Sequence, residues 1–130
     1  MNAEILVLAL SAGLGLLHII LASHSASFQR GYKWAAGARD EPLPPLSGIA
    51  GRLERASRNF FETFPVFVAA VVIVTIRAEE STVTAWASIV YLIARSAYLG
   101  AYVSGIYLLR SLIWNVATVA ILIILTASFV

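Results

Sequence analysis

One eleven-residue stretch of the chain, Arg52 to Glu62, holds three arginines, two glutamates and an asparagine directly before an apolar run. Because each residue of an α-helix turns by about 100°, five polar members fall within roughly 120° of one face. They are Arg52, Arg55, Arg58, Asn59 and Glu62. Guanidinium groups bind carboxylates through two parallel hydrogen bonds, so this stripe predicts a site for a small ligand that carries carboxylates. The stripe alone allows a second explanation, in which Arg58 simply pairs with Glu62 one turn later.

The composition of the chain favours lipid as its surroundings. Of its 130 residues, 60% are hydrophobic and 12% are charged, whereas a soluble domain carries about 25% charged residues. The length allows one domain, residues 1–130, and the net charge of +2 is too small to predict a nucleic-acid partner. Because the chain has no cysteine, disulfides, thiolate metal sites and cysteine nucleophiles are excluded.

Four helices account for the apolar segments, because a membrane crossing needs about 20 residues. We expect an all-α integral membrane four-helix bundle, with helices at about residues 4–28, 50–77, 82–103 and 106–129. The second helix reaches this length only if the polar stripe forms its first two turns. Gly105 favours a turn between the last two helices, and the proline-rich loop after the first helix is expected to be irregular. No Lys or Arg precedes Arg30, so a retained first helix is favoured over a cleaved signal peptide.

Basic residues gather on one side of the predicted membrane. Six of them lie between residues 23 and 58, whereas the other side has only Arg77, beside Glu79 and Glu80. The positive-inside rule therefore predicts that the loop after the first helix is cytosolic and that both termini lie outside.

A second polar stripe and one further arginine converge on the same leaflet. On the third helix, Arg95, Tyr98 and Tyr102 fall within about 60°, and Arg110 follows the turn at Gly105. In this zone the basic groups outnumber the acids, with Arg52, Arg55, Arg58, Arg95 and Arg110 against Glu54 and Glu62. A charge at the bilayer centre costs about 2.5–3.5 kcal/mol, so such groups should face a polar interior. The surplus of cations favours a bound anion over internal pairing.

Three motifs resemble the MAPEG family, the membrane-associated proteins in eicosanoid and glutathione metabolism. They are RLERASRNFFETFP on the second helix, ARSAYLGAY on the third and YLLRSL at the start of the fourth. The loop AAGARDEPLPPLSG is similar to the uncharacterised bacterial branch of this family. The resemblance implies a homotrimer of four-helix subunits in a bacterial inner membrane, with glutathione bound between subunits near the cytosolic face.

The resemblance also implies roles for individual residues. Arg110 would lie near the thiol of glutathione, with Ser111 as a second donor. The glutathione-binding positions would be matched by Arg30, contributed from the neighbouring subunit, and by Arg55, Arg58, Asn59, Glu62, Arg95, Tyr98 and Tyr102. Apolar side chains would line the pocket for a lipophilic partner from the membrane lipids, among them Leu21, Ile113 and Trp114.

The chemistry of thiols agrees with an arginine in a buried site. A thiol with a pKa of about 8.5 is only about 3% thiolate at pH 7. A cation that lowers this pKa by about two makes it roughly three quarters thiolate, for about 2.7 kcal/mol. We therefore expect a membrane-embedded transferase or peroxidase that uses glutathione or another thiol against lipophilic electrophiles. The alternative is a non-catalytic lipid- or thiol-binding scaffold of the same fold, because the family includes the five-lipoxygenase-activating protein.

Two other functions fit the sequence less well. His18 and His24 lie about 240° apart on a helix, and no second pair of metal-type ligands faces them, so no metal site is expected. A small proton-coupled exporter needs an acidic residue in the middle of the membrane, and the first helix has only Glu4 at its edge.

Overall fold

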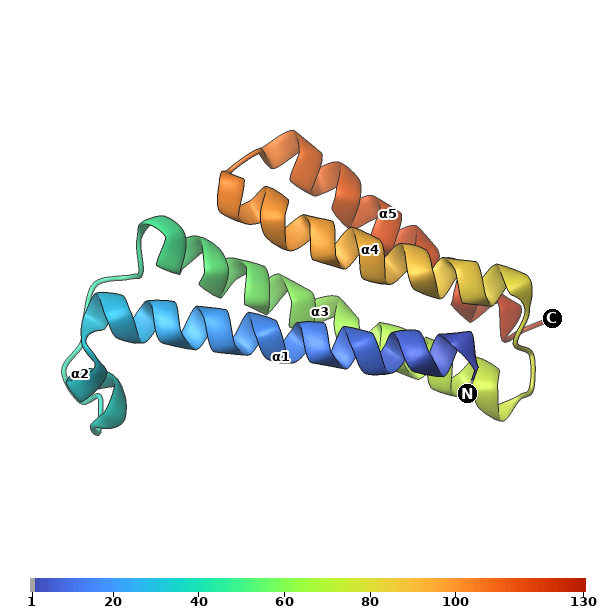
Figure 1. Ribbon diagram of the computed structural model, residues 1–130, viewed down its shortest axis with the longest axis horizontal. Coiled ribbons are helices and arrows are strands. Elements are labelled where there is room, and N and C mark those ends of the chain that lie inside the picture. Colours follow the sequence, from blue (N-terminus) through green and yellow to red (C-terminus); the bar gives the residue numbers. More distant parts are fainter. Residues whose placement is uncertain (1) are drawn as a thin grey trace.

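The computed structural model describes residues 2–130, which form five helices and no β-strand. The four long helices lie side by side along one axis (Figure 1): α1 (Ala3–Arg30), α3 (Gly48–Ile76), α4 (Thr82–Ser104) and α5 (Tyr107–Ala127). The most extensive packing joins α4 to α5 and α1 to α3, and α4 also contacts α1 and α3. Both termini lie at one end of the bundle, while the short α2 (Tyr32–Ala36) lies at the other. The expected all-α bundle is confirmed.

The loop after α1 is not irregular throughout, and this part of the expectation was wrong. Tyr32–Ala36 form the five-residue α2, because this part of the loop contains neither proline nor glycine. Gly31, with a φ of 94°, turns the chain from α1 into α2. Arg39 closes α2 from the other side, because its Nε and Nη2 donate hydrogen bonds to the Ala35 carbonyl at 2.9 and 2.8 Å.

The end of α1 is fastened to the start of α3 by one glutamine. The Gln29 amide nitrogen donates to Ser47 Oγ at 3.1 Å, and the Ser47 backbone N–H donates to Gln29 Oε1 at 3.1 Å. α1 therefore continues to Arg30 and α3 already starts at Gly48, each two residues beyond the bounds expected from sequence. The polar stripe consequently lies in the first half of a long continuous helix.

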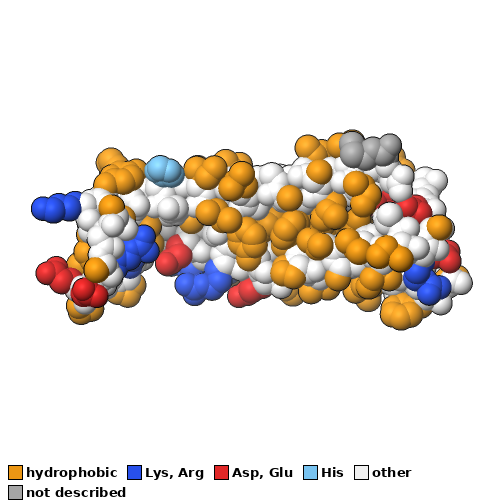
Figure 2. All heavy atoms as spheres, turned by 90° about the horizontal axis from the view of Figure 1, so that it is seen from below, with side chains coloured by type: hydrophobic (Ala, Val, Ile, Leu, Met, Phe, Trp, Pro, Cys, Tyr) orange, Lys and Arg blue, Asp and Glu red, His pale blue; other side chains and the backbone are white. Residues whose placement is uncertain are grey.

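Three of the helices are long and apolar enough to cross a membrane, namely α1, α3 and α5. α4 is less apolar than these three, although its 23 residues match the length of a membrane crossing, and the expectation that it also spans stays a prediction. Its buried face carries Thr84, Ser88 and Arg95, which lower its mean hydropathy. Because α4 contacts all three other long helices, these polar groups face protein. Figure 2 shows a broad hydrophobic area between charged side chains toward the α2 end and a second charged group at the opposite tip.

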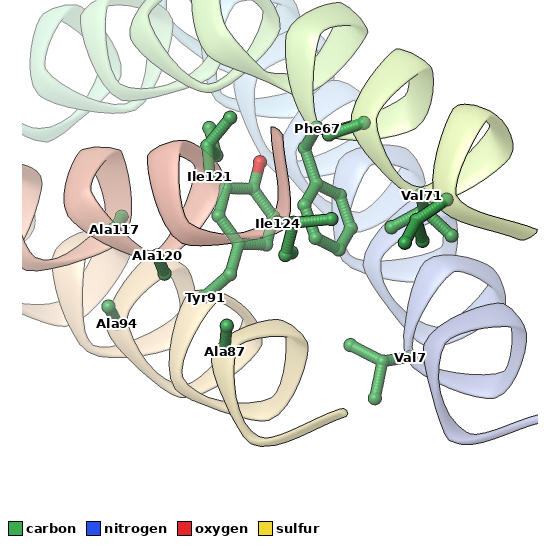
Figure 3. Close-up of a cluster of buried hydrophobic side chains, with 12 residues drawn as sticks. Val7, Phe67, Val71, Ala87, Tyr91, Ala94, Ala117, Ala120, Ile121 and Ile124 are labelled. Carbon is green, nitrogen blue, oxygen red and sulfur yellow. The ribbon is translucent and has the colours of Figure 1, made fainter. Parts of the chain in front are cut away.

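The apolar core fills the part of the bundle nearer the termini (Figure 3). The rings of Phe67 and Tyr91 stack there with centroids 3.8 Å apart, and Val71 and Ile124 are fully buried beside them. Because lipid tails are as apolar as these side chains, close van der Waals packing between the helices is what stabilises this part of the bundle. Toward the other end of the bundle, charged and phenolic side chains replace this core.

Local interactions determine where α4 begins and where it ends. At its start, Ser81 and Thr84 form a capping box, and the Thr84 hydroxyl donates to the buried Glu4 carboxylate at 2.6 Å. At its end, Gly105 adopts the left-handed conformation, with φ of 81° and ψ of 12°. The turn expected near Gly105 is therefore confirmed, and it sends α5 back along α4.

Gly51 packs so closely against the preceding loop that we expect alanine there to destabilise the protein. A Cβ at Gly51 would lie 2.7 Å from the Leu46 carbonyl oxygen, a backbone atom that cannot swing away. We expect Gly51→Ala to cost about 1–3 kcal/mol of unfolding free energy. Thermal unfolding in detergent, followed by circular dichroism, measures this.

The matched control for this prediction is another helical glycine. A Cβ at Gly100 would meet nothing within 4 Å, so Gly100→Ala should leave the thermal midpoint unchanged or raise it. Equal midpoints for the two variants would contradict the close approach at Gly51.

Candidate functional site

A cavity of about 450 Å³ opens between α3, α4 and α5, toward the end of the bundle that carries α2. This volume falls within the range of small-molecule sites in proteins, about 300–1,000 Å³. The residues that line it are Arg55, Arg58, Asn59, Glu62, Tyr98, Tyr102, Arg110, Ser111, Trp114 and Asn115. Eight of the ten site residues expected from sequence are therefore brought together around one cavity.

The position of these side chains follows from helix geometry. The α3 residues of the cavity lie on one face because they are three or four positions apart. The turn at Gly105 then brings Arg110 and Ser111, on the first turn of α5, opposite that face. Arg52 belongs to the same stripe but does not line the cavity. It stabilises the turn between α4 and α5 instead, because its Nη1 donates to the Val103 carbonyl at 2.8 Å. A cation at the carbonyl end of α4 also matches the helix dipole.

The charges around the cavity do not balance. Arg55, Arg58 and Arg110 line it together with a single carboxylate, that of Glu62, which gives a net charge of +2 from three positive and one negative group. Within residues 2–130, the hydrogen bonds donated by arginine side chains go only to neutral acceptors. These acceptors are the carbonyls of Ala35, Pro44 and Val103 and the Oδ1 atom of Asn59.

The carboxylates that do accept side-chain hydrogen bonds in the described chain lie elsewhere. Glu4 accepts from Thr84 and Glu80 accepts from Asn2, both at the end of the bundle with the termini. The Arg58–Glu62 pair considered from the sequence is not among the hydrogen bonds of residues 2–130. The cations of the cavity thus remain available to an anionic ligand.

Aromatic rings hold two of these cations in place. The guanidinium carbon of Arg110 lies 4.8 Å from the centre of the Tyr102 ring, and that of Arg55 lies 6.0 Å from it. The Tyr98 ring packs beside Tyr102, with centroids 5.6 Å apart. Cation–π contacts of this kind position a guanidinium without neutralising it, so the positive charge stays directed at the cavity.

The other two expected site residues, Arg95 and Arg30, do not line the cavity. Arg95 lies behind its wall with 1% of its surface exposed, and its Nη2 donates to Asn59 Oδ1 at 3.1 Å. Arg30 packs over the Trp34 ring at 5.3 Å, donates to the Pro44 carbonyl at 3.2 Å and lines a separate cavity with Glu54. Arg30 therefore lies outside the first cavity of its own chain.

Sequence reasoning missed one lining residue and misjudged another. Asn115 was not considered, and Trp114 was expected only in an apolar wall, yet both border the charged cavity. Each lies four positions after a predicted site residue, Arg110 or Ser111, so the helical repeat would have found them. The Asn115 amide nitrogen donates to the Ser111 carbonyl at 2.8 Å, and the Ser111 hydroxyl donates to the Tyr107 carbonyl at 3.2 Å.

Comparison with known proteins identifies the family of the chain. The model of the MAPEG family matches residues 7–130. No curated protein matches the chain. Members of this family are helical membrane proteins with glutathione-related transferase, peroxidase or related functions, and they generally oligomerise. The match extends through the polar stripe, the tyrosines of α4 and the arginine at the start of α5. The chain is therefore an integral membrane protein that belongs to the MAPEG family.

Proposed function

We propose that the protein binds glutathione in the charged cavity and uses its thiolate against lipophilic electrophiles from the bilayer, as a transferase or peroxidase. One observation carries this proposal: three arginines and one glutamate line the cavity, and no carboxylate of the described chain accepts a hydrogen bond from those arginines.

The charges of glutathione complement those of the cavity. With two carboxylates and one ammonium group the ligand carries −1, and its thiolate form carries −2, against the +2 of the lining side chains. Arg55 and Arg58 are suited to the carboxylates, because guanidinium groups bind them bidentately. Glu62 is the one acidic lining residue and is suited to the ammonium group.

Arg110 is proposed to stabilise the thiolate. It is half-buried at the start of α5, and its charge is permanent at every working pH. Lowering the thiol pKa by about two requires about 2.7 kcal/mol of preferential stabilisation, which one cation in a site of low dielectric can supply. Ser111 can add a hydrogen bond if its hydroxyl turns away from the Tyr107 carbonyl. In a conjugation, the sulfur then forms a bond to the electrophilic carbon of the acceptor and the leaving group departs with its electron pair.

The same proposal includes the assembly and its orientation. Both termini lie at one end, and the basic loop lies at the other (Figure 1). This supports a cytosolic loop in a bacterial inner membrane with both termini outside. In a homotrimer, Arg30 would reach the cavity of the neighbouring subunit, which accounts for its place outside the cavity of its own chain.

A titration with glutathione tests the proposal. We expect saturable binding by the detergent-purified protein, with ultraviolet absorbance of the thiolate appearing at neutral pH. 2-Mercaptoethanol has the thiol but no carboxylates, so it should not bind at the same concentrations. Native mass measurement of the same sample should give three subunits that each hold one glutathione. Binding without thiolate would favour the scaffold alternative, and absence of glutathione binding would refute the proposed function.

A further inference from the structure

We propose that Arg95 is a positioning residue, which fixes the side-chain amide of Asn59 so that its NH₂ group faces the ligand. This inference rests on the proposed function and deepens it. Arg95 is almost fully buried and does not line the cavity, whereas Asn59 and Tyr98, the two residues it holds, both do. The arginine therefore acts on the ligand through its neighbours.

The chemistry of the two side chains determines which way the amide points. A guanidinium group has five donors and no acceptor, so the Asn59 atom beside it must be the amide oxygen. The Arg95 Nη2 to Asn59 Oδ1 distance of 3.1 Å is that of a hydrogen bond. With Oδ1 held by Arg95, the Asn59 nitrogen is left to donate into the cavity.

Packing against two aromatic rings holds Arg95 in this position. Its guanidinium carbon lies 4.6 Å from the centre of the Tyr98 ring and 5.4 Å from that of Phe60. Phe60 is fully buried and is itself stacked on His18 of α1 at 4.8 Å. The position of the guanidinium is thus set by α1, α3 and α4 together, which leaves Arg95 little freedom to release Asn59.

This arrangement makes the Asn59 position specific for an acceptor on the ligand. A carboxylate or a peptide carbonyl can accept from the Asn59 nitrogen, whereas an ammonium group placed there would face another donor. Arg95 thereby divides the wall of the cavity: the Asn59 side selects acceptors, and the Glu62 side selects donors.

Aspartate at position 59 provides the sharpest test, because Asn59→Asp keeps the size of the side chain. The new carboxylate would pair with Arg95 but would offer no N–H to the ligand. We expect the thermal midpoint to stay at or above that of the wild type, while the Kd for glutathione in calorimetry rises by about 10- to 100-fold. A lower midpoint with unchanged Kd would overturn the proposed amide orientation.

A double-mutant cycle tests whether Arg95 acts through Asn59. We expect Arg95→Met to weaken glutathione binding in the wild-type background and to have a much smaller effect when Asn59 is already alanine, because only the contact with Tyr98 is then left to lose. Arg95→Lys keeps a donor and should restore part of the affinity. Equal losses in both backgrounds would show that Arg95 acts independently of Asn59 and would overturn the inference. Arg77→Met, at an exposed arginine that ends α3, is the control and should leave the Kd unchanged.

The contact between Arg95 and Asn59 can also be tested without a ligand. Arg95→Met should lower the thermal midpoint far more in the Asn59→Asp protein than in the wild type, because it leaves the new carboxylate at position 59 partly buried without a cation to pair with. Additive effects on the midpoint would refute the contact. If the wild type bound no glutathione, the proposed function would fail, and this ligand-free cycle would still decide the orientation of Asn59.

Discussion

Replacing Arg110 with alanine is expected to remove most of the thiolate of bound glutathione at pH 7. The cation favours the charged form of the thiol, so its loss should return the thiol pKa to its usual value of about 8.5. The thiolate fraction at pH 7 should then fall from roughly three quarters to about 3%, and the midpoint of the pH titration should rise by about two units. Thiolate absorbance of the saturated complex, recorded against pH, measures this shift directly.

Two further variants separate the charge of Arg110 from its shape. Arg110→Lys keeps a positive charge but loses the planar contact with Tyr102, so it should retain part of the shift. Arg77→Ala removes an exposed arginine outside the cavity and should leave the titration unchanged. If the complex of Arg110→Ala titrated with the wild-type midpoint, another group would stabilise the thiolate and the role proposed for Arg110 would be wrong.

The rate of conjugation should be proportional to the fraction of bound glutathione that is in the thiolate form. Because the thiolate is the nucleophile, a loss of about 25-fold in its amount at pH 7 predicts a comparable loss of conjugation rate. At a pH above about 9 both enzymes hold mostly thiolate, and the difference should shrink. A rate deficit that persists at high pH would mean that Arg110 also stabilises charge on the acceptor.

The helices and the polar stripe were predictable from the sequence because each depends on a local, periodic signal. The residues of α3 that line the cavity are three or four positions apart, and no tertiary contact is needed to place them on one face. The turn at Gly105 was equally local, since glycine adopts the left-handed conformation at little cost. The packing of α3 against α5 then brings Arg110 and Glu62 to the same cavity.

The sequence did not predict how deeply each site side chain is buried or which neighbouring helix it contacts. Arg95 and Tyr98 lie on the same stripe of α4, but Tyr98 lines the cavity and Arg95 does not. Arg95 packs against Phe60 of α3 instead, and this contact between helices cannot be read from the sequence. Arg30 is the last residue of the apolar helix α1, and it was expected to be a site residue. Its side chain instead packs over Trp34 of α2, a helix that was not expected, and lines another cavity. Long side chains such as arginine reach several ångströms from their Cα atoms, so their positions on the helix do not fix their targets.

Arg52 and Arg55 illustrate the same limit on neighbouring turns of α3. Both have the same side chain and lie on the same stripe, but Arg52 caps the end of α4 through the Val103 carbonyl, while Arg55 faces the cavity. Their different surroundings make them a matched pair for experiment, in which one variant should affect stability and the other binding.

Alanine at position 55 is expected to weaken glutathione binding without changing the titration of the bound thiol. Arg55→Ala would leave a ligand carboxylate without its charged donor, and hydrogen bonds to charged groups contribute about 1.5–3 kcal/mol. The Kd should therefore rise by about 10- to 100-fold. Calorimetry at two salt concentrations measures it, and the wild type should lose more affinity with added salt than the variant, because it has one more ionic contact to screen.

The contrast with two other positions gives this prediction its specificity. Arg52→Ala should lower the thermal midpoint and leave the Kd nearly unchanged, because Arg52 is bound to the Val103 carbonyl and does not line the cavity. Once glutathione saturates the Arg55→Ala protein, its thiol should still titrate near the wild-type midpoint, because Arg110 is intact. An unchanged Kd for Arg55→Ala would refute its assignment to a carboxylate. A shifted thiol midpoint would instead mean that Arg55 and Arg110 act on the sulfur together, through the Tyr102 ring that both contact.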